Sequence, residues 1–519
     1  MNRRTFLAAV GAAGLGGCSG FGDPTTETAA TAPAESDAST PTRAQGASPN
    51  PTSTRESPAG TATTPGDDSG VAAASIVDLE PTDRTYALAP TRYRTPDEGK
   101  ITARFASTAT AESPATLSAS LENANDFANT FRIEWTPPFG RLSSRVPEPF
   151  ADTDALADAT HRAGLVLAPT ANHELVDDPP EFERDDDGYW RLATGVDQWL
   201  PERVRLDPGE TVHGEYAVVG HADGAGEGRP PGVYEFRGRS DSTLRIAVWE
   251  TGRPGPEGGS RFEQQTLPPI SEEASTAWFH DADATTGTYL RPDREQARLP
   301  AQVAFTVVNK SRSTTGCGHW SLYKLDGERW YHIGPYVHTA DCRQLRPGQT
   351  KSWTLNADGG EALPPIGHGN GASFGFLGGG AYAAVVGYGG RADQSAALVE
   401  LKGDEVSIEP TDDVTSERSD ATVTVTSPRR ERTDNSAPAE LTLTSADEAN
   451  RTLVPEQVMQ RRYRGLRNTV GFVEEAIETV TLRTSERVAE RVVGHDADRR
   501  RFRIRGTGTY EVSIERQSA

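Results

Sequence analysis

Two cysteines and three histidines lie close together in the segment CGHWSLYKLDGERWYHIGPYVHTADC, residues 317–342. Thiolate and imidazole groups are the ligands that zinc and copper prefer in proteins. If Asp326 and Gly327 form the turn of a hairpin, His332 faces Ser321 and lies diagonal to His319. An extracytoplasmic metal-binding or redox protein is therefore one interpretation, and its site would use Cys317, His319, His332, His338 and Cys342.

A disulfide between Cys317 and Cys342 is the simpler interpretation of the same segment. No C-x-x-C or H-x-x-x-H pair fixes two metal ligands locally, and a single pair of cysteines in an exported protein usually forms a disulfide. The bond would close a loop of 26 residues and would stabilise the fold by about 3 kcal/mol. We therefore expect the disulfide and no metal or other cofactor, with free thiols and the metal site as the alternatives.

One further motif could indicate catalysis. Gly371-Ala372-Ser373-Phe374-Gly375 matches the G-x-S-x-G pattern of hydrolases, which requires a buried strand before the serine and a helix after it. The flanking segments LPPIGHGN and FLGGGAYAAVV predict neither. We interpret the motif as strand residues, and no other motif argues for an enzyme.

The C-terminal segment contains two groups of regularly spaced arginines. Arg461, Arg464 and Arg467 are spaced to share one side of a helix, whereas Arg501, Arg503 and Arg505 alternate on one face of a strand. Both groups are candidates for docking an anion. The alternative, which we favour, is that they pair with the protein's own carboxylates or line a solvated face.

The N-terminus is typical of a targeting segment. In MNRRTFLAAVGAAGLGGC the paired Arg3 and Arg4 precede a short apolar run that ends at Cys18, and this run is too short and glycine-rich to span a bilayer. The segment resembles a twin-arginine export signal followed by a lipoprotein lipobox. The resemblance implies cleavage before Cys18, a lipid on its sulfur, and anchoring at the extracytoplasmic face of the cell membrane.

The composition agrees with an extracellular, high-salt setting. The formal net charge is −22, and only five of the 53 basic residues are lysines. This imbalance resembles a haloarchaeal proteome, in which salt screens the repulsion among carboxylates. The net field repels phosphate, so we expect no nucleic-acid partner. Asn309 and Asn450 begin N-x-[ST] triplets and are candidate glycosylation sites.

Most of the chain has the alternating pattern of antiparallel strands, with turn residues every 8–12 positions. A series of landmarks also occurs twice: Asn123, Trp190, Pro208-Gly209 and Tyr234, then Asn309, Trp330, Pro347-Gly348 and Tyr382. The series resembles immunoglobulin-like domains of prokaryotic surface proteins, with an insertion around 137–187 in the first copy. We therefore expect a mainly β fold: two tandem immunoglobulin-like β-sandwiches and a small α+β domain.

The C-terminal domain and the boundaries complete this prediction. Residues 454–478 form the only convincing helical pattern, and RVAERVVGHD is interpreted as a strand. The predicted segments are a signal with lipobox (1–18), a disordered Ser/Thr/Pro-rich tether (19–72), a sandwich (73–250), a linker (251–270), a second sandwich (271–409), a linker (410–420) and the α+β domain (421–519).

Together these patterns predict a lipid-anchored surface protein with a non-catalytic binding or structural role. Its expected partners are the membrane, through the lipid on Cys18, and an unidentified surface protein or glycan. A carbohydrate-binding sandwich is a further alternative. It would require exposed, coplanar aromatic side chains among Trp135, Trp190, Trp199, Trp320 and Trp330.

Overall fold

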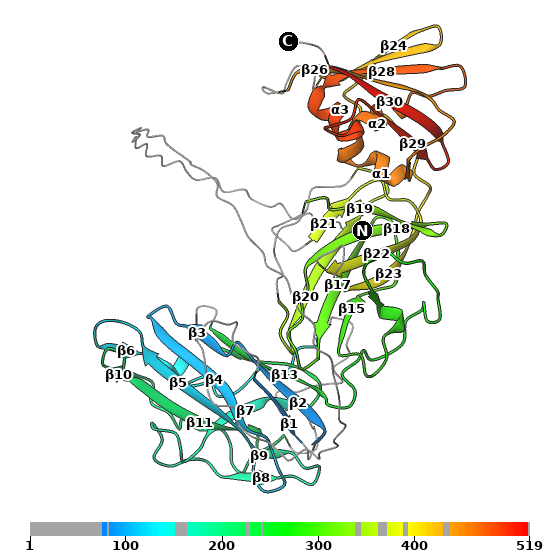
Figure 1. The fold of residues 1–519 in the computed structure, drawn as a ribbon. Helices are drawn as coiled ribbons and strands as arrows, with labels where there is room; N and C mark the ends of the chain where they lie inside the picture. The colour runs from blue at the N-terminus through cyan, green and yellow to red at the C-terminus, as the bar shows by residue number, and fades with distance from the viewer. Residues whose placement is uncertain are drawn as a thin grey trace, which may run out of the picture. The chain divides into compact units, whose positions relative to one another are not determined.

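The computed structural model describes residues 75–79, 82–150, 163–224, 229–239, 242–337, 344–361, 371–387, 393–428 and 436–516. All of them belong to one compact unit, Ser69–Ala519. Strands predominate in this part of the chain (Figure 1), which confirms the prediction of a mainly β, sandwich-like fold. Within the described residues, no helix is both long and apolar enough to cross a membrane. The signal, Cys18 and the predicted tether to residue 72 lie outside these residues.

Two sheets face each other in the first part of the chain. One sheet has the order β1 (Ser75–Leu79), β2 (Arg84–Ala89), β13 (Thr243–Glu250), β12 (Gly232–Arg237). The other has the order β3 (Arg92–Arg94), β4 (Gly99–Ser107), β5 (Ala115–Asn123), β11 (Thr211–Gly220), β9 (Trp190–Leu192), β8 (Phe182–Arg184), and β7 (Leu165–Pro169) also pairs with β11. Alternate residues of β5 are buried between the sheets, as the period-two pattern predicts. β6 (Asn129–Phe131) and β10 (Val204–Leu206) form a separate pair.

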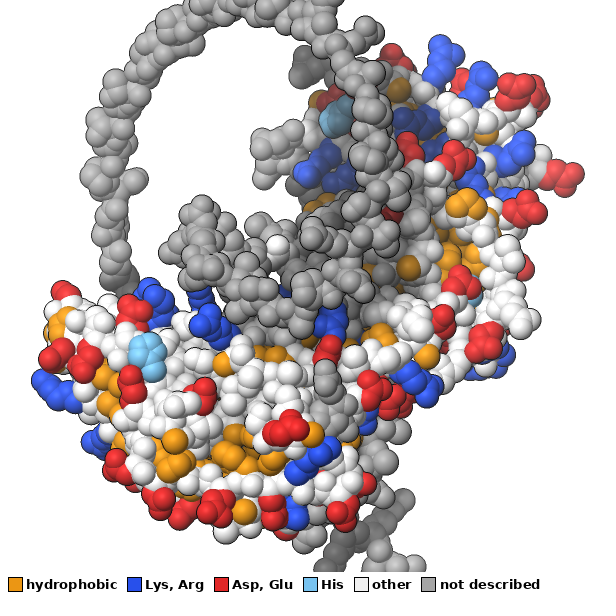
Figure 2. Space-filling view, turned by 60° about the horizontal axis from the view of Figure 1, so that its bottom comes forward, with side chains coloured by type: hydrophobic (Ala, Val, Ile, Leu, Met, Phe, Trp, Pro, Cys, Tyr) orange, Lys and Arg blue, Asp and Glu red, His pale blue; other side chains and the backbone are white. Residues whose placement is uncertain are grey.

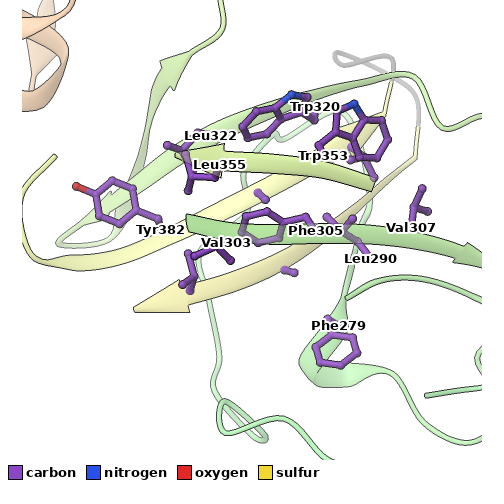
Figure 3. Packing of buried hydrophobic residues seen from close by; sticks show 14 of the residues in the cluster. Phe279, Leu290, Val303, Phe305, Val307, Trp320, Leu322, Trp353, Leu355 and Tyr382 are labelled. Atoms are coloured by element: carbon purple, nitrogen blue, oxygen red, sulfur yellow. The ribbon is translucent and has the colours of Figure 1, made fainter. Parts of the chain in front are cut away.

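A second pair of sheets encloses its own core. One sheet has the order β14 (Thr276–Trp278), β23 (Gln394–Lys402), β22 (Gly380–Gly387), β18 (His319–Asp326), β19 (Arg329–Gly334), with β16 (Gln296–Arg298) beside β23. The facing sheet has the order β15 (Thr288–Pro292), β17 (Ala301–Asn309), β20 (Thr350–Ala357), β21 (Gly371–Phe374). Figure 3 shows Phe305, Trp353 and Leu355 of one sheet meeting Trp320, Leu322 and Tyr382 of the other. Burial of these large side chains is the main stabilising contribution here.

The C-terminal part is a sheet covered by short helices. The strand order is β24 (Thr415–Ser419), β25 (Thr422–Thr426), β28 (Thr479–Ser485), β26 (Pro438–Ser445), β30 (Gly508–Arg516), β29 (Arg499–Ile504), β27 (Arg451–Leu453). The helices α1 (Pro455–Met459), α2 (Arg464–Val470) and α3 (Glu486–Val493) contribute apolar residues to the same core as the strands.

Two details of the helix prediction are wrong. The pattern at 454–478 is interrupted at Gln460, whose extended backbone (φ −71°, ψ 151°) separates α1 from a 3-10 turn and α2. RVAERVVGHD is mostly helix α3, because Ala489, Val492 and Val493 are buried at helical spacing. Its β-branched valines favour a strand locally, but packing against the sheet decides the conformation.

Asn123 and Asn309 occupy equivalent positions in the two sandwiches. Each is completely buried at the end of its strand. Asn123 Nδ2 donates to the carbonyls of Phe127 (2.9 Å) and Leu206 (3.0 Å), and Asn309 Nδ2 donates to those of Ser313 (2.9 Å) and Leu345 (2.8 Å). The internal repeat therefore has a common structural role, which is to hold the turn around each Pro-Gly pair.

The backbone of each Pro-Gly turn is bound in the same way. Gly209 N donates to Asn123 O (2.9 Å), and Gly348 N donates to Asn309 O (2.6 Å). Both glycines have a positive φ, 73° and 75°, which explains the need for glycine. Asn309 is buried and its amide nitrogen is engaged, so its predicted use as a glycan acceptor is incompatible with this fold. Asn450 is exposed and stays a candidate.

Tyr234 and Tyr382 form a second pair of equivalent residues. Tyr234 Oη donates to Pro230 O (2.8 Å), and Tyr382 Oη donates to Gly378 O (2.8 Å). A tyrosine that closes a corner by bonding to backbone four residues earlier resembles the tyrosine corner of immunoglobulin-like sandwiches.

The tryptophan landmarks are not equivalent. Trp190 lies in β9, which belongs to the sheet that contains Asn123. Trp330 lies in β19, in the sheet opposite Asn309. The matching spacing from tryptophan to proline is therefore not a structural correspondence.

Both predicted linkers are packed against their neighbours. Phe262, Leu267 and Ile270 of the 251–270 segment cover the outer face of the second sandwich, and Pro268 O accepts a hydrogen bond from Trp330 Nε1 (2.8 Å). The 410–420 segment contains strand β24. Proline and glycine suggest free linkers, but apolar side chains tie the first segment to a sheet, and antiparallel pairing of β24 with β25 ties the second.

Candidate anion-binding site

The hairpin that would have to build a metal site has a different register from the predicted one. Gly327 and Glu328 form the turn, so Tyr323 pairs with His332, and a bulge follows between Leu322 and Tyr323. The His332 ring lies 5.0 Å from that of Tyr323 and 4.9 Å from that of Tyr336. The predicted pairing of His332 with Ser321 is therefore wrong, because the positive φ of Gly327 (62°) falls at the first turn residue.

The described members of the proposed metal set are not gathered around a common point. Cys317 is buried in the core of the second sandwich. Among the described residues, no group of three or more Cys, His, Asp or Glu side chains could hold a metal ion. His338 and Cys342 lie outside the described residues, so the disulfide between Cys317 and Cys342 stays a prediction.

The tryptophans do not form an exposed binding platform. Trp320 and Trp330 are buried, while Trp190 and Trp199 pack partly buried against the first sandwich core. Trp135 lies under the guanidinium groups of Arg141 (4.0 Å) and Arg239 (5.7 Å). The aromatic surface that the carbohydrate interpretation requires is therefore missing from these five positions.

The arginines of the predicted helix come together at a cavity. Arg461, Arg464 and Arg467 line a space of about 530 Å³ between the second sandwich and the C-terminal domain. The other lining residues are Glu361, Ser373, Gly375, Phe376, Thr411, Met459 and Gln460. Arg461 projects from the 3-10 turn, and Arg464 and Arg467 from α2, one turn apart.

Hydrogen bonds fix the walls of this arginine cavity. Gln460 Nε2 donates to Gly375 O (3.0 Å), joining the arginine-bearing segment to the sandwich. Thr411 N donates to Asn468 Oδ1 (2.8 Å) on the opposite side. The cavity is therefore built from segments far apart in the sequence.

The three guanidinium groups differ in how many hydrogen-bond and ion-pair partners they have. Arg467 Nε donates to Glu409 O (2.6 Å), and its guanidinium lies 4.6 Å from the centre of the Phe376 ring. Arg464 forms an ion pair with Asp413, yet its buried Nε has no hydrogen-bond partner. Arg461 is exposed and has no hydrogen bond or ion pair within the described residues.

The electrostatic environment of the cavity leaves positive charge available. Desolvation, together with the neighbouring Arg464, lowers the pKa of Arg467 from its ordinary value, although an arginine stays protonated at neutral pH. Among the described lining residues Glu361 is the only carboxylate, against three guanidinium groups, one of which, that of Arg464, pairs with Asp413. An oxyanion in the cavity could accept hydrogen bonds from the exposed guanidinium of Arg461, beside Arg464 and Arg467.

The second predicted arginine group is used differently. Arg501 forms an ion pair with Glu511 on β30, and Arg505 forms one with Asp326 of the second sandwich. These two arginines therefore pair with the protein's own carboxylates. Arg503 is exposed and has no such contact within the described residues. Figure 2 likewise shows acidic and basic side chains intermixed on the face that it presents.

Several cavity residues could not be found from the sequence. Ser373 and Phe374 lie in strand β21, as interpreted from the sequence, whereas Phe376 lies beyond its end with a positive φ, so the strand interpretation is wrong there. The position of Ser373 beside arginines some 90 residues later has no local signal. Phe376, Met459 and Thr411 likewise look like ordinary strand, helix and loop residues. No protein-family model matches the chain, and no curated protein matches it.

Proposed function

We propose that this protein is a lipid-anchored extracytoplasmic surface protein of haloarchaeal type that binds an anionic ligand without transforming it. The arginine cavity is the observation that carries the binding role. Its volume of about 530 Å³ lies within the range of small-molecule sites, roughly 300–1,000 Å³. Arg461, which has no hydrogen bond or ion pair within the described residues, supplies donors for the ligand, and Arg464 and Arg467 line the same space.

A binding role agrees with the side chains that surround the cavity. Among the described lining residues, Ser373 and Thr411 are the two whose side chains could act as nucleophiles. Among the described residues, Ser373 forms no hydrogen bond with a histidine or carboxylate that could activate it. The arginines can bind and orient an oxyanion, and the lining carboxylate Glu361 forms no hydrogen bond with Ser373.

Cellular fractionation tests the anchoring part of the proposal. We expect the wild-type chain in the membrane fraction, released by detergent, and the Cys18→Ser variant free outside the cell. Replacing Arg3 and Arg4 together with lysine should retain the chain in the cytoplasm. Membrane attachment of Cys18→Ser equal to that of the wild type would contradict the lipid anchor.

Thermal unfolding with added anions tests the binding part. Phosphate, sulfate, acetate and benzoate are compared at constant ionic strength, because a ligand that binds the folded state raises its melting temperature. We expect at least one anion to stabilise the wild type and not an Arg461→Gln/Arg464→Gln variant. Arg462→Gln is the matched control, since Arg462 lies over Tyr336 and not in the cavity. Equal shifts in all three proteins would contradict a site in the cavity.

A further inference from the structure

Phe376 has an unusual backbone conformation for its residue type. Its φ is 54°, in the left-handed region that bulky side chains rarely adopt. Gly375, Gly378, Gly379 and Gly380 lie beside it in the sequence GFLGGG, and a glycine at 376 would have no such penalty. Strained residues of this kind are concentrated at ligand-binding sites, which suggests that the aromatic ring has a use.

The surrounding backbone holds Phe376 in place. Phe376 N donates to Gly360 O (2.6 Å), and Leu377 N donates to Asp358 O (2.9 Å). The ring lines the arginine cavity and lies under the Arg467 guanidinium. The position of the ring is thus determined from both sides, by backbone hydrogen bonds and by a cation–π contact.

Phe376 and Met459 give the cavity an apolar wall beside its charged one. Met459 is only 3% exposed, yet it lines the same space. An inorganic oxyanion would contact the arginines and leave the exposed part of the Phe376 ring against water, whereas Met459 is already almost completely buried. Because burying apolar surface is favourable, a ligand with an apolar body gains more from this cavity than a bare anion.

Resting on the proposed function, we propose that the ligand is an organic anion: its oxyanion group contacts Arg461 and Arg464, and its aromatic or aliphatic body packs on Phe376 and Met459. Arg467 already contacts Glu409 O and the Phe376 ring, so it lies between the charged part and the apolar part of the cavity wall. Guanidinium groups suit both carboxylates and phosphate esters, and the apolar body is the feature that discriminates among anions.

Calorimetric titration with matched probes tests this inference. The purified Cys18→Ser chain is titrated with phenyl phosphate and inorganic phosphate, and with benzoate and acetate, at constant ionic strength. We expect each aromatic member to bind at least about tenfold more tightly than its small partner. Equal affinities within both pairs would overturn the inference and leave the proposed function standing. If none of the four probes binds, the proposed function fails as well.

Substitutions at Phe376 locate the apolar contact. Phe376→Gly suits the backbone conformation, so the fold is retained while the ring is lost. We expect this variant to bind inorganic phosphate as the wild type does, and to lose the preference for phenyl phosphate. Phe376→Leu should keep part of it. An unchanged preference in Phe376→Gly would show that the aromatic group binds elsewhere and would overturn the assignment.

Discussion

Lys324 of β18 and Glu456 of α1 form an ion pair that is almost completely removed from solvent. Their side chains are 14% and 3% exposed, and Lys324 Nζ also donates to Gly379 O (3.3 Å). A second polar contact lies beside it, since Gln457 Nε2 donates to His332 O (2.9 Å). The C-terminal domain is thus attached to the second sandwich by buried polar groups next to the arginine cavity.

Removing one member of this pair should destabilise the protein strongly. Lys324→Met leaves the Glu456 carboxylate buried without its partner, and we expect the free energy of unfolding to fall by about 3–5 kcal/mol. Urea denaturation measures the change. Arg94→Ala is the control, because Arg94 and Glu98 are 62% and 52% exposed and a pair of this kind contributes at most about 1 kcal/mol. Similar losses in the two variants would contradict the structural importance of the buried pair.

The asparagines of the two Pro-Gly turns should be equally important. Asn123→Ala and Asn309→Ala each remove donors to buried carbonyls, and we expect each to lower the free energy of unfolding by about 2–3 kcal/mol. Asn450→Ala, at an exposed position, should have little effect. If only one of the two substitutions lowered the free energy of unfolding, the two asparagines would not have the same structural role.

His173 should make stability depend on pH. Its Nδ1 accepts a hydrogen bond from Leu175 N (3.2 Å), so Nε2 carries the proton and lies 2.8 Å from Tyr216 Oη. Burial lowers the pKa of His173 to about 4, against about 6.5 in the unfolded chain. The unfolded state therefore binds a proton that the folded state does not, and stability from this group is lost as the pH falls from about 6.5 to about 4.

The variant His173→Gln isolates this contribution. Between pH 6.5 and pH 4, the free energy of unfolding of the wild type should fall more steeply with pH than that of the variant. The difference in slope should be at most that expected for the uptake of one proton on unfolding. His213→Gln, at an exposed histidine, makes the same substitution without removing a buried imidazole. Parallel pH profiles for the wild type and His173→Gln would contradict a neutral, buried His173.

The disulfide proposed between Cys317 and Cys342 has indirect support from the neighbouring backbone. Thr315 and Leu345 form a two-way bridge (2.9 and 2.8 Å), which closes the loop a few residues outside the two cysteines. We expect the intact mass to be two units below that of the reduced chain, and thiol labelling only after reduction. Reduction should lower stability by about 3 kcal/mol. Labelling of both cysteines in the native protein without a reductant would contradict the bond.

The strand-rich architecture could be predicted from the sequence because its signals are local. Alternating burial in β5, the turn glycines Gly209 and Gly348, and the tyrosines Tyr234 and Tyr382 follow from period and turn chemistry. Helix α3 was misjudged because its valines favour strands locally, and the helix forms through contacts with the sheet. The hairpin turn likewise lies one residue later than predicted, so His332 pairs with Tyr323 and not with Ser321.

The candidate site could be predicted only in part. The spacing of Arg461, Arg464 and Arg467 predicts a shared helix side, and these arginines do line one cavity. The opposite wall comes from Ser373 of strand β21 and from Phe376 just beyond that strand, and no pattern in one sequence reports such a long-range contact. The pairing of Arg505 with Asp326 had no local signal for the same reason.

A calorimetric titration of the purified chain with phenyl phosphate tests the arginine cavity most directly, comparing the wild type, Arg461→Gln/Arg464→Gln and Arg462→Gln. If the cavity arginines hold the ligand, the wild type and Arg462→Gln should each bind it at one site. The double variant should lose at least about a hundredfold in affinity, since each charge-assisted hydrogen bond contributes roughly 1.5–3 kcal/mol. Equal affinity in all three proteins, or no binding in any, would contradict an anion site in the arginine cavity.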